Sequence, residues 1–127
     1  MNSRAAMTVR ILLGVSRMVF GHNKIFHFFA PPPHSGDAAK AFLGGLAGSG
    51  YFFPFLGGVE ALCGAALVAG LFVPLALVVL APVMLNIVLF HLFLDIEGMA
   101  VGGLLGIMQA HLMWSYRNSF SSLLRPR

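Results

Sequence analysis

The sequence holds 127 residues, of which 58% are hydrophobic and only 9% charged, and its mean hydropathy is +0.87. Soluble domains are about 45–50% apolar and about 25% charged, so this chain cannot cover a globule of its size with polar side chains. We therefore expect an integral membrane protein rather than a soluble one. The formal charge of +4 does not indicate a nucleic-acid partner, because the basic residues form no cluster but lie mostly near the two ends of the chain.

The first expected span covers residues 7–29 and is the least apolar, since it carries several polar and charged side chains. Three prolines at 31–33 end it, because consecutive prolines cannot continue a helix. A short helix, "AAKAFLGGL", is expected next, with Asp37 as its N-cap. Three large apolar residues share one side of this helix (Phe42, Leu43 and Leu46). The helix is therefore expected to lie in the membrane interface or to pack back against the other helices.

Residues 52–94 form one apolar run that is too long for a single membrane-crossing helix, which needs about 20 residues. Gly70 suits the end of one helix and Pro74 the first turn of the next. The run is thus divided into spans at 53–70 and 74–94. A fourth span, 98–116, ends in "WSYR", which is typical of an aromatic anchor beside a cytoplasmic arginine.

The predicted fold is all-α: a four-helix transmembrane bundle in a single domain, 1–127, with a short interfacial helix between the first two spans. Four spans place both termini on one side of the membrane. The arginines near both ends indicate that this side is the cytoplasm, and the acidic residues of the connections then lie outside.

Small residues recur at helical spacing in two spans. Gly98, Gly102 and Gly106 form overlapping GxxxG units, and a second stripe consists of Gly57, Ala61, Ala65 and Ala69. Such stripes let helix backbones approach closely in lipid, so we expect them to pack within the bundle.

Glu60 interrupts an otherwise apolar segment, and an ionisable residue inside a span usually faces the protein interior and pairs there. Arg17, Gly21 and Lys24 are spaced four and three residues apart and share one helix face. At a rise of about 1.5 Å per residue, Glu60 and Lys24 lie at similar depths below the outer boundary. The predicted site consists of Arg17, His22, Lys24, Glu60, Asn86 and His91. A ligand or proton site and a structural ion pair both remain open.

Three segments cover most of the chain: "RILLGVSRMVFGHNKIF", "SGYFFPFLGGVEALCGAALVAGLFVPLALVVLAPVMLNIVLFHLFLD" and "WSYRNSF". They include the face of Arg17, Gly21 and Lys24, the pair Glu60 and Gly64, and the stretch "NIVLFHLFL". In combination they resemble the DoxX family of small four-helix bacterial membrane proteins. The family takes its name from a membrane subunit of a thiosulfate:quinone oxidoreductase. The resemblance implies the bacterial cytoplasmic (inner) membrane and a quinone-linked or redox-partner role. It does not imply that this member oxidises thiosulfate.

Three functions remain open: a subunit of a quinone-linked redox complex, a non-catalytic scaffold or assembly factor, and a carrier of a small anion or lipid. An enzymatic activity would need another polypeptide, and a homo-oligomer is the alternative partner; no catalytic residue is assigned. Cys63 is the only cysteine, which excludes a disulfide or CxxC redox pair within the chain. Haem is disfavoured because His22 and His27, five residues apart, do not share a helix face. No metal site is expected.

Overall fold

The computed structural model describes residues 3–28, 36–124 and 126, and regular structure in these residues is entirely helical. Residue 29, the prolines 31–33, and residues 125 and 127 lie outside the described residues. The elements in chain order are α1 (Ser3–Phe26), α2 (Asp37–Gly48), α3 (Phe52–Ala69), α4 (Val73–Phe93), η1 (Ile96–Gly98), α5 (Met99–Ser115), α6 (Arg117–Phe120) and η2 (Ser121–Leu124).

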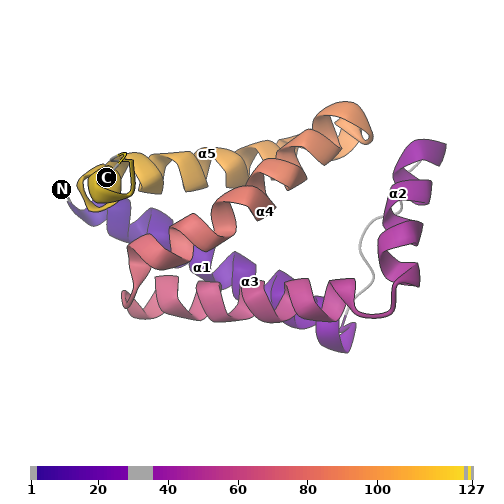
Figure 1. Ribbon diagram of the computed structural model, residues 1–127, viewed down its shortest axis with the longest axis horizontal. Coiled ribbons are helices and arrows are strands. Elements are labelled where there is room, and N and C mark those ends of the chain that lie inside the picture. The colour runs from indigo at the N-terminus through magenta and orange to yellow at the C-terminus, as the bar shows by residue number, and fades with distance from the viewer. Residues whose placement is uncertain (1–2, 29–35, 125, 127) are drawn as a thin grey trace.

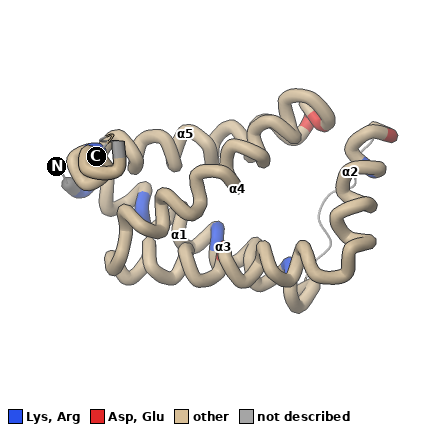
Figure 2. The backbone as a smooth tube through the Cα atoms, in the orientation of Figure 1, with Lys and Arg blue, Asp and Glu red and all other residues tan. Residues whose placement is uncertain are grey.

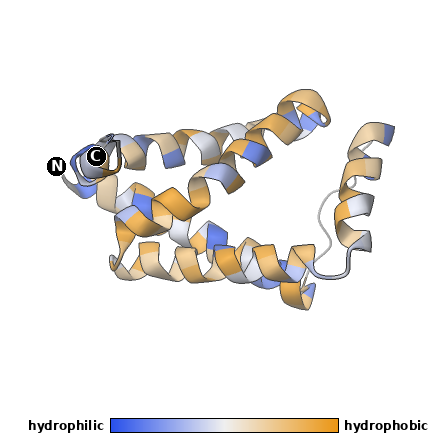
Figure 3. Ribbon diagram, in the orientation of Figure 1, coloured by the Kyte–Doolittle hydropathy of each residue, from blue (hydrophilic) through white to orange (hydrophobic). Residues whose placement is uncertain are grey.

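Three stretches of the described chain are long and apolar enough to cross a membrane, namely Phe52–Ala69, Val73–Phe93 and Ile96–Ser115. They match the second, third and fourth predicted spans closely, and Figure 3 shows the hydrophobic colouring of α3 and α4. The remaining long helix, α1, has 24 residues but does not belong to this apolar group. It carries four cations and no acidic residue (Arg4, Arg10, Arg17 and Lys24).

The connection between α3 and α4 forms where the sequence predicts it. Gly70 adopts a left-handed conformation, with φ of +76°, and its N–H donates to the carbonyl of Ala66 at 2.9 Å. Glycine is the residue that adopts this conformation without strain, so it suits the end of a helix. Pro74 lies in the first turn of α4, where its missing N–H costs nothing.

The four long helices α1, α3, α4 and α5 lie alongside one another, and each packs against two others (Figure 1). The most extensive packing is between α1 and α3, which run in opposite directions; α4 packs mainly on α5. The α1–α3 pair and the α4–α5 pair lie close together near the two chain termini, which we call the termini end. They diverge toward the opposite end, where α2 stands across them.

The contact between α1 and α3 is made by glycines that face each other in two pairs. A β-carbon on Gly14 would lie 2.8 Å from the carbonyl oxygen of Gly64, and one on Gly21 would lie 2.6 Å from that of Gly57. On each helix the two glycines are seven residues apart, the period at which two packed helices keep the same face together. The backbones can approach this closely only because no side chain stands between them.

This seven-residue spacing corrects part of the predicted stripe on α3. Gly57 and Ala61 do lie against α1, since the backbone N of Ala61 is 2.7 Å from a β-carbon placed on Gly21. Ala65 and Ala69 are exposed instead. Residues spaced four apart turn gradually away from the face of α3 that contacts α1. Gly64, seven residues after Gly57, remains on that face.

A leucine-rich core lies between the four long helices. Its fully buried members come from α1, α3, α4 and α5: Leu13, Leu67, Leu77, Leu80 and Leu112. Many other large apolar side chains are exposed, among them Leu62, Leu75, Leu85, Leu104 and Ile107. An exposed apolar surface of this extent is expected when lipid replaces water around the helices.

Helix α2 packs back on the other helices through the side that the sequence pattern predicts. The ring centroid of Phe42 lies 5.7 Å from that of Phe90 on α4. The prediction that Asp37 caps this helix is wrong, because Gly36 occupies the N-cap position and makes no side-chain cap bond. Asp37 lies one residue later, in the first turn, where a carboxylate interacts favourably with the helix dipole.

Candidate functional site

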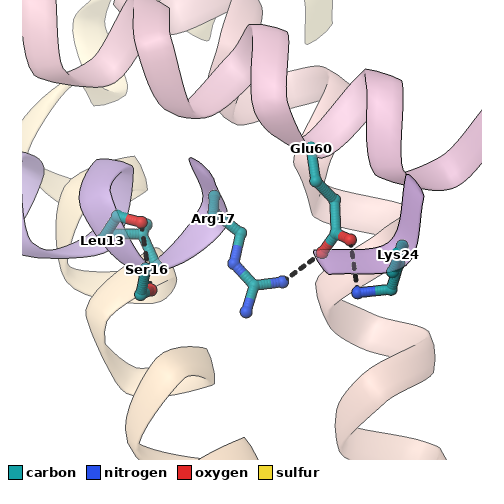
Figure 4. A network of polar contacts seen from close by, with 5 residues as sticks. All are labelled: Leu13, Ser16, Arg17, Lys24 and Glu60. Atoms are coloured by element: carbon teal, nitrogen blue, oxygen red, sulfur yellow. Dashed lines mark hydrogen bonds and ion pairs between the residues drawn. The ribbon is translucent and has the colours of Figure 1, made fainter. Parts of the chain in front are cut away.

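Glu60 is fully buried and lies between two cations of α1 (Figure 4). Nη1 of Arg17 donates to Oε2 of Glu60, and Nζ of Lys24 lies 2.6 Å from the other carboxylate oxygen, Oε1. The Arg17 side chain is 3% exposed, whereas the Lys24 side chain is 25% exposed. We call these three residues the ion cluster.

The geometry of the ion cluster follows from the glycine contact between α1 and α3. Gly21 lies on the same face of α1 as Arg17 and Lys24, between them in sequence. A β-carbon on Gly21 would lie 3.1 Å from Cβ of Glu60, so the absent side chain is what leaves room for Glu60. The Arg17 guanidinium also lies 5.6 Å from the centre of the Phe20 ring, a cation–π contact.

A pocket of about 190 Å³ lies beside the ion cluster, at the end of the molecule away from the termini. We call it the polar-walled pocket, because three polar residues contribute to its lining: Lys24, Asn86 and His91. The rest of the lining is aromatic or aliphatic and comes from α2, α3 and α4: Phe42, Leu43, Leu46, Phe52, Phe53, Leu56, Ile87 and Phe90. Lys24 belongs to both the pocket and the ion cluster, so the two form one continuous site.

His91 is held in place by α5 and by the turn that follows α4. Its Nδ1 lies 3.3 Å from the carbonyl oxygen of Asp95 and 3.5 Å from Oδ2 of the same residue. The imidazole ring occupies the space above Gly98 and Gly102, where a β-carbon would overlap it. The GxxxG stripe of α5 therefore packs within the molecule, as its sequence predicts, and the histidine fills part of the gap.

Two of the predicted site residues stand apart from Glu60 in different ways. His22 lies outside the pocket lining: its Nδ1 is 2.7 Å from the carbonyl oxygen of Met18, and its ring stacks on Phe26. Position 22 is five residues from Arg17 and so points from another face of α1. Asn86 is exposed and lines the pocket, which it shares with Lys24.

One feature of this region was not predicted from the sequence: Phe42, Leu43 and Leu46 contribute to the site, although their shared side of α2 was the available signal. Gln109 of α5 is also buried, and its Nε2 donates to the carbonyl oxygen of Leu77 at 2.9 Å. Gln109 therefore links α5 to the backbone of α4. In the described parts of the chain, no three His, Cys, Asp or Glu residues are grouped so that they could hold a metal ion.

These features define a helical membrane protein with a buried ion cluster beside a largely apolar pocket. The family model DoxX matches residues 5–92, and the chain belongs to the DoxX family. The matched range contains every residue of the ion cluster and of the pocket lining. Comparison with curated proteins gave no match. Comparison with solved structures also gave none.

Proposed function

We propose that this protein is the membrane subunit of a quinone-linked redox complex, and that the polar-walled pocket holds the quinone ring. The observation that carries the proposal is the position of Lys24, which pairs with buried Glu60 and also lines an apolar, aromatic pocket. Small-molecule sites commonly combine a mostly apolar lining with a few polar groups that orient the ligand. The pocket has this composition.

The polar side chains suit the carbonyl oxygens of a quinone. The ammonium of Lys24 and the amide of Asn86 are hydrogen-bond donors, and His91 donates or accepts according to its protonation. The lining also contains Phe52 and Phe90, and aromatic side chains pack favourably against a flat ring. The aromatic and aliphatic part of the lining also suits an isoprenoid tail.

We also propose that α1 is a fourth span, which makes a four-helix transmembrane bundle in the bacterial inner membrane with both termini in the cytoplasm. Its cations do not prevent this, because Arg17 and Lys24 face Glu60 rather than lipid. The charge distribution supports the orientation. Arg4 near the start of α1 and Arg117 at the start of α6 lie near the termini, whereas Asp95 and Glu97 lie in the connection between α4 and α5. Figure 2 shows acidic positions at that connection and on α2, away from the termini end. The pocket and α2 then lie near the outer interface.

Electron transfer in such a complex requires a partner chain. Cys63 is the only cysteine, so a thiol relay within this chain is impossible. The role proposed for this subunit is to bind and orient the quinone beside the ion cluster. The electrons pass between the quinone and a cofactor of the partner polypeptide.

Photolabelling with an azidoquinone tests the pocket. Membranes containing the wild-type protein should incorporate the label in peptides from α2 and from the second half of α4. Lys24→Met should reduce labelling severalfold, whereas Lys40→Met removes an exposed lysine of α2 outside the pocket lining and serves as the matched control. Labelling spread evenly over the lipid-facing helices, and unchanged in Lys24→Met, would remove the basis of the proposal.

The second candidate is a non-catalytic scaffold or assembly factor, in which the ion cluster only fixes the register of α1 on α3. The close glycine contact favours it, since this contact alone would place Arg17 opposite Glu60. Co-purification in mild detergent, followed by mass spectrometry of bound molecules and chains, separates the two functions. A scaffold retains its partner chain and carries no quinone.

A further inference from the structure

We propose that the polar-walled pocket binds its ligand as an anion: an amphiphile whose head carries an ionised oxygen, held against the ammonium of Lys24. This inference rests on the proposed quinone-type ligand and specifies its charge. A hydroxyquinone that is ionised at neutral pH represents the class. A neutral quinone of the same size represents the class that the pocket should disfavour.

The charge of the ion cluster is the first argument. Two cations, Arg17 and Lys24, meet one carboxylate, so the cluster carries a formal charge of +1 in the interior. The chain has three further acidic residues, and none of them is buried beside the cluster. Asp37 and Glu97 are exposed, and Asp95 lies next to His91. The Asp95 side chain is only 9% exposed and contacts His91 of the pocket lining. Within the ion cluster itself one carboxylate faces two cations, so an excess positive charge remains.

The accessibility of the three charged groups is the second argument. Glu60 is completely buried and the Arg17 side chain nearly so, whereas a quarter of the Lys24 side chain is accessible. Lys24 is also the member of the ion cluster that belongs to the pocket lining, which contains no carboxylate. A ligand in the pocket therefore meets the excess charge through Lys24 alone, without a competing acidic group in the lining.

The apolar lining makes this charge effective. Eight of the eleven lining residues are aromatic or aliphatic, so a bound ligand displaces water and leaves the ammonium weakly screened. A neutral ligand would cover Lys24 and leave the net charge of the cluster uncompensated, which is costly in an apolar environment. An ionised oxygen would neutralise it. The amide of Asn86, which also lines the pocket, can donate to a carbonyl oxygen of the ligand.

Two probes of equal size test the inference. The first is a hydroxynaphthoquinone whose acidic hydroxyl is ionised at neutral pH. The second is the methylnaphthoquinone in which a methyl group replaces that hydroxyl. Their affinities for the purified full-length protein in lipid nanodiscs would be measured by equilibrium dialysis. We expect the anionic probe to bind at least about tenfold more tightly than the neutral one.

Variants connect this preference to Lys24. Lys24→Met should bring the two affinities to within about threefold of each other, and the control Lys40→Met should preserve the wild-type ratio. Circular dichroism and gel filtration of Lys24→Met establish that the variant is folded. If it is not folded, the ratio in the wild-type protein decides the question alone.

The outcomes distinguish failure of this inference from failure of the proposed function. Equal binding of both probes to the wild-type protein, at the labelled pocket, would refute the anionic ligand while leaving the quinone site in place. Tighter binding of the neutral probe would do the same. Absence of binding by either probe would refute both. A preference for the anion that persists unchanged in folded Lys24→Met would show that a group other than Lys24 binds the anion. That result would also overturn the inference.

Discussion

Gly21 of α1 and Gly57 of α3 face each other so closely that neither position can accept a side chain without movement of the other helix. A β-carbon on Gly21 would lie 2.6 Å from the carbonyl oxygen of Gly57, and one on Gly57 would lie 2.5 Å from that of Gly21. The obstacle in each case is backbone, which cannot rotate away as a side chain can. This contact also holds Glu60 opposite Arg17 and Lys24, so stability and the candidate site depend on the same pair of residues.

Gly57→Ala should therefore destabilise the protein, by about 1–3 kcal/mol, because the added methyl group forces α1 and α3 apart. The adjacent Gly58 is a matched control, since a β-carbon placed there meets nothing within 4 Å. Gly58→Ala should be neutral or stabilise by up to about 1 kcal/mol through its higher helix propensity. Denaturation in increasing sodium dodecyl sulfate, followed by circular dichroism, measures both. Equal effects of the two substitutions would contradict the contact.

Glu60→Gln should lower the free energy of unfolding by about 3–5 kcal/mol, because it leaves two cations without their carboxylate in the interior. A double-mutant cycle isolates the contribution of the direct pair. Arg17→Met combined with Glu60→Leu should cost less than the sum of the two single changes, with a coupling energy above about 1 kcal/mol. Additive effects would mean that the two side chains do not stabilise one another.

Gly102→Ala should weaken binding of a quinone probe severalfold, since the new methyl group would overlap the His91 ring and displace it from the pocket wall. Gly103→Ala, one residue further along α5, is the control: its β-carbon would come no closer than 3.5 Å to its nearest neighbour, Sδ of Met99. Equilibrium dialysis of both variants measures the effect. If Gly102→Ala retains full affinity, His91 does not contribute to ligand binding.

Four spans with cytoplasmic termini predict opposite labelling of two engineered cysteines. In a Cys63→Ala background, Lys40→Cys on α2 should react with a membrane-impermeant maleimide in intact spheroplasts. Asn118→Cys on α6 should react only after lysis. Lys40 and Asn118 are both exposed in the structure. A cysteine that is not labelled in intact spheroplasts is therefore shielded by the membrane and not by burial in the protein. Labelling of both cysteines in intact spheroplasts would place them on the same side of the membrane, and would exclude the three crossings proposed between them.

The helices were predictable because residues that favour helix ends, such as glycine and proline, mark their boundaries in the sequence. Gly70 and Pro74 divide a long apolar run at the point where the chain turns, and the predicted and observed ends differ there by one residue. The pairing of Glu60 with the α1 cations was also expected, since a lone carboxylate among apolar residues needs a partner. Helix spacing alone identified the face that carries those cations.

The pocket could not be predicted, because it depends on how α2 folds back across the other helices. The apolar side of α2 was visible in the sequence, but its contact partner was not, since an interfacial position was equally consistent with the pattern. His22 shows the opposite limit. Its chemistry suited the site, but its position on α1 directs it to Met18 and Phe26 instead. Residue type thus identifies candidates, and helix face decides among them.

The dependence of α1 on Glu60 has a consequence for biogenesis. In the proposed four-span arrangement, α1 brings Arg17 into the bilayer before its partner exists, because Glu60 is synthesised 43 residues later. A buried arginine without a counter-ion is costly in lipid, so α1 is a poor candidate for release from the insertion machinery on its own. It should be retained there, or at the interface, until α3 emerges and the two helices enter the membrane together. The first helix of the chain is then stably inserted no earlier than α3.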